Sequence, residues 1–282
     1  MPDPSVAHQF VHNLKPVVLQ CARASLVFYG QVADLGKIAD ASLTGARAQD
    51  ASSVFTALDS SLQDILLSVV LQHYPDVRCI AEESTPLRRR FAGNRSEYTV
   101  ILDPIDGTLH FRNGDGPYHI SIGLARNGAM IAALVARPTE DKLYTAICGH
   151  GAWVQRGDQA PERLRVPDRP RTRAAFISSK AHQYQSLARP ELEPRDHPIG
   201  AALILTQLAE GELCAYLTRQ VEVYDVGPPS LIAEEAGVCC FLRNGCKPRY
   251  STRRKFPFYM AAAGAEPKAK LWSILRARGA LS

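Results

Sequence analysis

The sequence predicts a protein of the α+β / α/β class built in two parts, and three patterns support this fold class. Two long segments with apolar residues at helical spacing open the chain. A series of short apolar runs typical of β-strands follows them. After a proline-rich stretch, short strand-like and helical segments alternate. We therefore expect two helices covering a mostly antiparallel sheet, followed by an α/β unit.

The two N-terminal segments are expected to be helices. The first spans about residues 6–29, where apolar side chains recur every three or four positions. The second begins at residue 52 or 53, where a serine is a suitable N-cap, and reaches about His73. Pro75 then ends it, because proline cannot continue a helix.

Short apolar runs in the middle of the chain predict strands. They span residues 77–81, 98–102, 119–125, 129–136, 142–148 and 152–155. Arg126-Asn127-Gly128 predicts a hairpin turn, because Asn-Gly suits positive φ angles. His119 alternates with apolar residues in its run, so a structural role is expected for it. Residues 84–97 are polar and arginine-rich and predict a mobile loop.

Three prolines between residues 159 and 173 mark a change in composition. We place a subdomain boundary there, with residues 1–165 as an α+β subdomain and residues 166–282 as an α/β subdomain. The expected C-terminal strands are 174–178, 213–217 and 238–242, and the expected helices are 181–188, 201–211, 228–236 and 266–277.

Composition narrows the class of protein. The 282 residues are 46% hydrophobic and 22% charged, as in ordinary globular proteins. The longest wholly apolar run, residues 129–136, is too short to cross a bilayer, and the N-terminus lacks the features of a signal peptide. Seven cysteines without a C-x-x-C pair predict reduced thiols, most of them buried, and no zinc site. We therefore expect a cytoplasmic protein.

The net charge of +5 comes with clustered arginines. Such clusters are found in solvated loops, in sites for anionic substrates and in nucleic-acid interfaces. No aromatic residues are interleaved with them at the spacing of a stacking platform, so nucleic acid is not favoured as a partner.

The most informative segment is Asp103-Pro104-Ile105-Asp106-Gly107-Thr108, which directly follows an apolar run. Proline and glycine turn the backbone there, so that two carboxylates and exposed N–H groups gather at one point. Hard divalent cations prefer carboxylate and carbonyl oxygens, and phosphate binds free N–H groups. This segment could hold a metal ion together with a phosphate group.

Further carboxylates occur at the expected ends of elements, and each also has a structural interpretation. Asp59 could lie on the solvent face of its helix. Glu82 and Glu83 could be exposed loop acids, Asp103 a turn former, and Asp225 a simple N-cap.

Taken together, these acidic segments match the pattern of a known family in their order and context, which favours a common site. The segments are Thr56-Ala57-Leu58-Asp59, Ala81-Glu82-Glu83, Asp103 to Thr108, Tyr224-Asp225 and Glu235-Ala236-Gly237-Val238, with Tyr118 to Gly123, Leu143 to Ala146 and Gly149 to Ala152 as secondary matches. Over roughly residues 50 to 245 the chain thereby resembles the inositol monophosphatase superfamily of magnesium-dependent, lithium-sensitive phosphatases. The resemblance implies a layered α-β-α-β-α sandwich and a homodimer.

The resemblance also implies roles for individual residues. Glu82, Asp103 and the carbonyl of Ile105 would hold one Mg²⁺, and Asp103, Asp106 and Asp225 a second. Thr108, hydrogen-bonded to Asp59, would orient and help deprotonate a water on the first ion, with Glu82 counted among the catalytic residues. The N–H groups of Gly107 and Thr108 would bind phosphate. A third ion would be possible, and Li⁺ would inhibit.

Several positions depart from the family pattern. Tyr224 replaces a tryptophan, Ala81 a glycine, and Leu109-His110 a Thr-Asn pair. Thr218, followed by Arg219, occupies the position of an acid that holds the sugar-like ring, so we assign Thr218 and Arg219 to substrate binding.

Three functions stay open. The first is an inositol-1-monophosphatase-like phosphomonoesterase acting on a small phosphorylated polyol, with sugar bisphosphates or histidinol phosphate as further possible substrates. The second is a 3′(2′),5′-bisphosphate nucleotidase. The third is a non-catalytic binding or regulatory protein on the same fold.

Overall fold

Two β-sheets and three layers of helices make up the protein. The computed structural model describes residues 4–31, 57–93, 95–167, 169–189, 191–195, 200–250 and 255–277. The helices are α1 (Pro4–Leu26), α3 (Ala57–His73), α4 (Thr108–Asn113), α5 (Gln185–Ala188), α6 (Ala201–Glu210), α7 (Val223–Ala236) and α8 (Ala265–Ala277). The 3-10 helices are η1 (Arg88–Phe91), η2 (Pro138–Glu140) and η3 (Ser179–Tyr184).

The described strands form one seven-stranded and one five-stranded sheet. The first sheet runs β1 (Arg78–Ala81), β2 (Tyr98–Asp106), β3 (His119–Arg126), β4 (Ala129–Arg137), β5 (Lys142–Ile147), β6 (Gly151–Arg156) and β7 (Glu162–Leu164) in chain order. The second has the order β11 (Cys239–Phe241), β12 (Lys255–Ala262), β10 (Ala215–Glu222), β8 (Ala174–Ile177) and β9 (Glu193–Arg195). The first sheet is antiparallel as expected, except that β1 and β2 run parallel.

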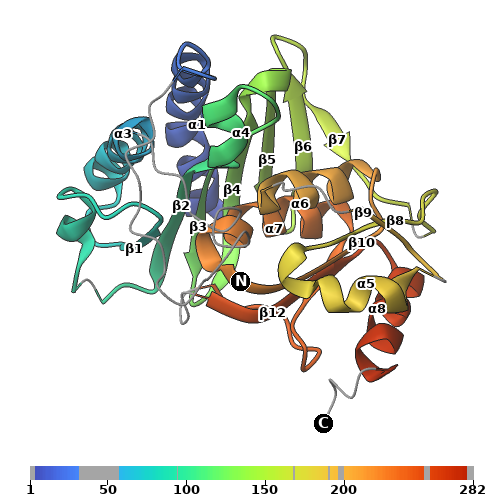
Figure 1. Ribbon diagram of the computed structural model, residues 1–282. Coiled ribbons are helices and arrows are strands. Elements are labelled where there is room, and N and C mark those ends of the chain that lie inside the picture. Colours follow the sequence, from blue (N-terminus) through green and yellow to red (C-terminus); the bar gives the residue numbers. More distant parts are fainter. Residues whose placement is uncertain are drawn as a thin grey trace, which may run out of the picture.

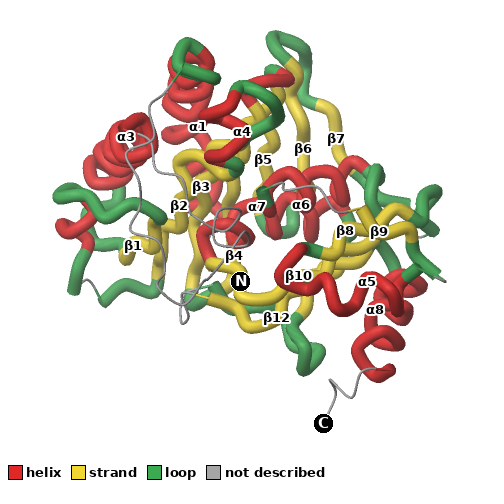
Figure 2. Tube along the Cα trace, viewed as in Figure 1, coloured by secondary structure: helices red, strands yellow, loops and turns green. Residues whose placement is uncertain are grey.

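The helices and the two sheets are stacked in layers (Figure 1), and apolar cores lie between neighbouring layers. One core lies between α1, α3 and the first sheet, where Phe10, Leu66 and Ile122 are fully buried. A second lies around α6 and α7, between the two sheets. The third joins the second sheet to α5 and α8. This order of layers, which Figure 2 shows by colour, confirms the expected α-β-α-β-α sandwich.

Several boundaries differ from the expected ones. β2 continues to Asp106 instead of ending at residue 102, with a register shift between Asp103 and Asp106. α7 begins at Val223 rather than residue 228, because prolines inside it imitate a helix start in the sequence. Three observed strands, β7, β9 and β12, were not expected. β7 and β9 are only three residues long. β12 contains a proline, and a proline usually argues against a strand. Residues 52–56 of the second expected helix lie outside the described residues.

The segment expected to be a mobile loop, residues 84–97, is folded back on the protein wherever it is described. The Thr85 hydroxyl donates to Asp64 at 2.5 Å, and Arg88 donates to the carbonyl of Glu83 at 3.0 Å. Phe91 is buried at the end of η1. These contacts fix the backbone just after Glu82 and Glu83.

All seven cysteines lie in described residues and none of them forms a disulfide; contrary to the expectation that most are buried, only Cys21, Cys214 and Cys240 are. Cys148 and Cys246 are exposed, whereas burial raises the pKa of Cys79 to about 12. The two sheets divide between Leu164 and Ala174, and the subdomain boundary at residue 165 stays a prediction.

Two of the sequence segments singled out above meet at the end of α7. The Glu235 carboxylate accepts hydrogen bonds from the N–H groups of Gly149 and Gly151, both at 2.8 Å. Gly151 begins β6 and Gly149 lies two residues before it. The Glu235 side chain therefore fastens α7 to the first sheet.

We expect Glu235→Ala to lower the free energy of unfolding by about 1–3 kcal/mol, because two N–H groups lose a charged acceptor. Glu235→Gln keeps one carbonyl acceptor and should fall between this variant and the wild type in urea denaturation. Glu212→Ala, which removes an exposed carboxylate, is the control and should change stability by no more than about 0.5 kcal/mol. Equal stability of Glu235→Ala and the control would contradict the assignment.

Candidate metal centre

The C-terminal end of β2 places its two aspartates beside each other on a tight turn. The Asp103 carboxylate accepts a hydrogen bond from the Ile105 N–H at 3.1 Å. Gly107 then adopts a φ of 92°, where an L side chain is strained, and a Cβ there would lie 3.2 Å from the carbonyl of Pro117. α4 begins at Thr108, whose hydroxyl donates to the Ile105 carbonyl at 2.9 Å.

The structure gathers the predicted acids into two groups. Within each group, one ligand atom of every residue lies within 4.8 Å of the others. The groups are Asp59, Glu82 and Glu83, and Asp103, Asp106 and Asp225. They come from α3, from the end of β1, from β2 and from α7, so four elements converge on one place.

Three structural interpretations of these acids are wrong. Asp59 is fully buried at the start of α3 and does not lie on a solvent face. Glu83 is buried, so it is not a loop acid in solvent. Asp225 lies in the first turn of α7, where it accepts a hydrogen bond from the N–H of Glu222, the N-cap residue, at 3.2 Å.

The carboxylates of the second group repel one another strongly. Burial and the charge of Glu82 raise the pKa of Asp103 well above its usual range, and the nearby aspartates add to this effect. Burial raises the pKa of Asp106 to about 7. Burial and the charge of Asp106 likewise raise the pKa of Asp225 well above its usual range. Each carboxyl group therefore makes the ionisation of its neighbours more costly.

This set of donors suits a hard divalent cation. All the groups offer oxygen, and the segment between Asp103 and Asp106 adds the Ile105 carbonyl, which accepts the Thr108 hydroxyl. A cation of charge +2 would offset the repulsion that raises the pKa values. The acidic groups could therefore bind metal ions.

The N-terminus of α6 also points into this site, which the sequence analysis missed. The Ala202 N–H donates to Asp106 Oδ2 at 2.6 Å, and it lowers the pKa of Asp106 against the effect of burial. A Cβ on Gly200 would lie 2.3 Å from the Asp106 carboxylate, so only glycine allows this approach. The sequence did predict that a helix starts at residue 201. The direction in which the N-terminus of this helix points, however, depends on how the helix packs.

Thr218 and Arg219 lie on opposite faces of β10, as successive strand residues do. Thr218 is buried, and its hydroxyl is hydrogen-bonded to Ser178 at 2.8 Å. The Arg219 guanidinium lies 5.0 Å from the centre of the Phe258 ring. Thr218 therefore shares a face of β10 with Tyr216, and Arg219 does not. Burial raises the pKa of Tyr216, and the charge of Asp225 adds to this effect, so this face is the one near the acidic site.

Lys180 in η3 is a further residue that the sequence analysis did not assign. Its ammonium group donates to the carbonyl of Gln220 at 3.2 Å. Its charge lowers the pKa of Asp225, against the effect of burial. A lysine therefore stands at the rim of the second acidic group.

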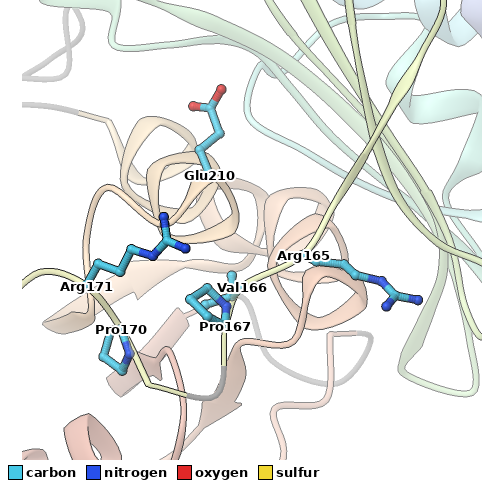
Figure 3. Close-up of a pocket in the computed structure, with 7 residues that line it drawn as sticks. Arg165, Val166, Pro167, Pro170, Arg171 and Glu210 are labelled. Carbon is cyan, nitrogen blue, oxygen red and sulfur yellow. The ribbon is translucent and has the colours of Figure 1, made fainter.

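A separate pocket of about 550 Å³ lies at the other end of α6 (Figure 3). Its lining residues are Arg165, Val166, Pro167, Pro170, Arg171, Glu210 and Gly211. Asp106 meets the first turn of α6, whereas Glu210 and Gly211 end the helix. Ten residues of helix span about 15 Å, so this pocket is distinct from the acidic site.

Comparison with known proteins agrees with this geometry. A sequence profile of the inositol monophosphatase family matches residues 20–277. The chain belongs to this family. The family is one of phosphomonoesterases, although some members bear the name of Nus factors.

Individual relatives carry both kinds of name. An inositol-1-monophosphatase of Mycobacterium leprae is 32% identical over 201 residues, which cover 67% of this chain and 69% of the relative. The Nus factor SuhB of Pasteurella multocida is 28% identical over 199 residues, covering 66% and 71%. An inositol monophosphatase structure from Thermotoga maritima matches with a TM-score of 0.75 at 19% identity, covering 95% of this chain and 97% of that one. The structural match confirms the fold.

Among the described helices, none combines the length and the apolar character that a membrane crossing requires.

We expect Mg²⁺ to raise the melting temperature of the wild-type protein, because a ligand that binds the folded state stabilises it. Asp103→Asn should melt higher than the wild type in EDTA, since it removes one of the repelling charges, and should gain little from Mg²⁺. Asp158→Asn, the same change at an exposed acid, should behave as the wild type in both conditions. The metal assignment would be wrong if Asp103→Asn responded to Mg²⁺ as strongly as this control.

Proposed function

We propose that the protein is a Mg²⁺-dependent phosphomonoesterase that hydrolyses a small phosphorylated polyol, as an inositol-1-monophosphatase does. The observation that carries this proposal is the convergence of the two acidic groups on the turn after β2. Family membership and the relatives that are named inositol-1-monophosphatases support it.

In this proposal Glu82, Asp103 and the Ile105 carbonyl hold one Mg²⁺, and Asp103, Asp106 and Asp225 hold a second. Asp103 belongs to both sets, in keeping with the influence of Glu82 on its pKa. The group of Asp59, Glu82 and Glu83 offers a place for a third ion. When bound, such ions make a coordinated water more acidic and neutralise charge on the phosphate.

The residues of the chain supply positioning and proton transfer. Thr108 and Asp59 orient the attacking water, and Asp59 receives its proton through the Thr108 hydroxyl, which for this step turns its own proton from the Ile105 carbonyl to Asp59. The hydrogen bond from Thr108 to the Ile105 carbonyl keeps this hydroxyl next to a proposed metal ligand. The N–H groups of Gly107 and Thr108 bind phosphate oxygens, because the positive φ of Gly107 turns the backbone there. The link between Thr108 and Asp59 stays part of the proposal.

One observation favours a second substrate class. The buried hydroxyl of Thr218, hydrogen-bonded to the partly buried Ser178, stands where the family pattern has a carboxylate, and Lys180 places a positive charge near Asp225. This arrangement suits a substrate with an additional anionic group, as in a 3′(2′),5′-bisphosphate nucleotide. Arg219 has no part in this argument, since it lies on the other face of β10.

The relatives named Nus factor SuhB favour a third possibility, a binding or regulatory role that needs no catalysis. A protein with this role alone would show no Mg²⁺-dependent phosphatase activity. A homodimer and inhibition by Li⁺ complete the proposal; size-exclusion chromatography with light scattering tests the dimer.

The substrate classes are separated by phosphate release from inositol 1-phosphate and from adenosine 3′,5′-bisphosphate, with and without Mg²⁺ and Li⁺. We expect Mg²⁺-dependent turnover of the inositol phosphate that Li⁺ inhibits. Faster turnover of the bisphosphate would favour the nucleotidase. Activity on neither substrate would leave the binding role as the better explanation and contradict our proposal.

Replacement of one metal ligand tests the mechanism. We expect Asp106→Asn to lower kcat by on the order of a thousandfold, or about 4 kcal/mol of barrier. The asparagine oxygen can still accept the Ala202 N–H, so the circular dichroism spectrum should stay that of the wild type. Asp158→Asn again serves as the matched control, and a variant at position 106 with wild-type kcat would refute the assignment.

A further inference from the structure

Arg137, the last residue of β4, is only 2% exposed and makes an unusual number of polar contacts for a buried side chain. Its guanidinium donates to His119 Nε2 at 3.0 Å, to Thr206 Oγ1 at 2.7 Å and to Glu140 at 2.9 Å. Glu210 lies 3.5 Å away. A planar guanidinium with five N–H donors can hold several partners in a fixed arrangement at once.

One route from Arg137 leads through α6 to a proposed metal ligand. The Thr206 hydroxyl, which accepts from Arg137, donates to the Ala202 carbonyl at 2.8 Å. The N–H of Ala202 in turn donates to Asp106 Oδ2 at 2.6 Å. Two side chains and the first turn of one helix thus connect the guanidinium to the carboxylate.

A second route leads to the same aspartate through the first sheet. Arg137 donates to His119, which begins β3, and His119 is the register partner of Asp106 across β2 and β3. The two routes close a ring of five residues: Asp106, Ala202, Thr206, Arg137 and His119. The ring fixes α6 against the sheet at the place where the Asp106 carboxylate emerges.

The positive charge of Arg137 is balanced inside the protein. Glu210 accepts from Arg137 and from Lys142, and Arg156 lies 3.8 Å from it. Glu140 contacts Arg137 and Lys142 from the exposed side. The Tyr144 ring lies 5.3 Å from the guanidinium carbon. These partners offset the cost of burying the guanidinium charge. Arg137 can therefore have a role besides its contribution to stability.

We propose that Arg137 is a positioning residue for Asp106. It holds α6 so that the Ala202 N–H restrains the Asp106 carboxylate, one oxygen of which lies within 4.8 Å of a ligand atom of Asp103 and of Asp225. This inference rests on the proposed metal site. Groups that orient a metal ligand in this way commonly contribute 10-fold to 100-fold to metal affinity.

The decisive variant is Thr206→Val, which keeps the shape of the side chain but breaks the ring. We expect its Mg²⁺ dissociation constant, measured by isothermal titration calorimetry without substrate, to rise about tenfold. Thr206→Ser keeps the hydroxyl and should restore wild-type affinity. With substrate at saturating Mg²⁺, kcat should fall while KM changes little, because Thr206 contacts no proposed substrate group.

Two controls separate positioning from general loss of stability. Glu140→Ala removes a contact of Arg137 that lies outside the ring, and it should keep the Mg²⁺ affinity within twofold of wild type. Glu235→Ala, which is expected to destabilise the fold elsewhere, should also keep it. A Thr206→Val protein that folds and binds Mg²⁺ as tightly as these controls would overturn the proposal.

Substitution of Arg137 itself completes the test. Arg137→Met should weaken Mg²⁺ binding at least as much as Thr206→Val, and the double variant should be no weaker than the weaker single one, since both break the same ring. Additive effects in the double variant would contradict the ring. If Arg137→Met does not fold, Thr206→Val decides alone.

The calorimetric readout keeps the two proposals distinguishable. Mg²⁺ binding without turnover of any phosphate ester would refute the proposed function but would still test the ring. A wild-type protein that binds no Mg²⁺ would overturn both.

Discussion

The crowding of carboxylates at the end of β2 is the constraint on which the rest of the structure depends. Burial and the charge of Glu82 raise the pKa values of Asp103, Asp106 and Asp225, and the charge of Asp106 adds to the effect on Asp103 and Asp225. Such an arrangement costs stability unless other interactions hold it in place. The surrounding architecture can be understood as the support that it requires.

That support comes from the layer between the two sheets. α7 carries Asp225 in its first turn, where the Asp225 carboxylate accepts the N–H of Glu222. α6 donates the Ala202 N–H to Asp106, and Arg137 holds α6 in place through Thr206. The two central helices therefore separate the sheets and also direct polar groups toward the turn after β2.

Opposite ends of α6 consequently have different chemistry. At the N-terminal end, backbone N–H groups face a carboxylate, which suits the positive end of the helix dipole. At the C-terminal end, Glu210 pairs with Arg137 and Lys142 and also lines the separate pocket. Arg137, at the end of β4, contacts Thr206 within α6 and Glu210 at its C-terminal end, so it joins the first sheet to this helix at two places.

The sequence by itself determined the family and most of the elements that carry its acidic residues. The order of Asp59, Glu82, Asp103, Asp106 and Asp225 along the chain indicated one site, because each lies at an expected end of a helix or strand. Apolar periodicity located the helices and strands of the layered fold, since burial of one face imposes a regular pattern. Boundaries near prolines and three-residue strands were missed, because their stability comes from pairing with neighbours.

Only the tertiary structure decided which polar groups meet. Thr218 and Arg219 are adjacent in sequence but face opposite sides of β10. Arg137, Thr206 and Ala202 are distant from Asp106 in sequence, yet they form hydrogen bonds that lead to its carboxylate. Local sequence encodes propensity and the face that is buried, whereas the direction of a helix end depends on how whole layers pack. For that reason the carboxylates could be predicted from the sequence, and the groups that aim them could not.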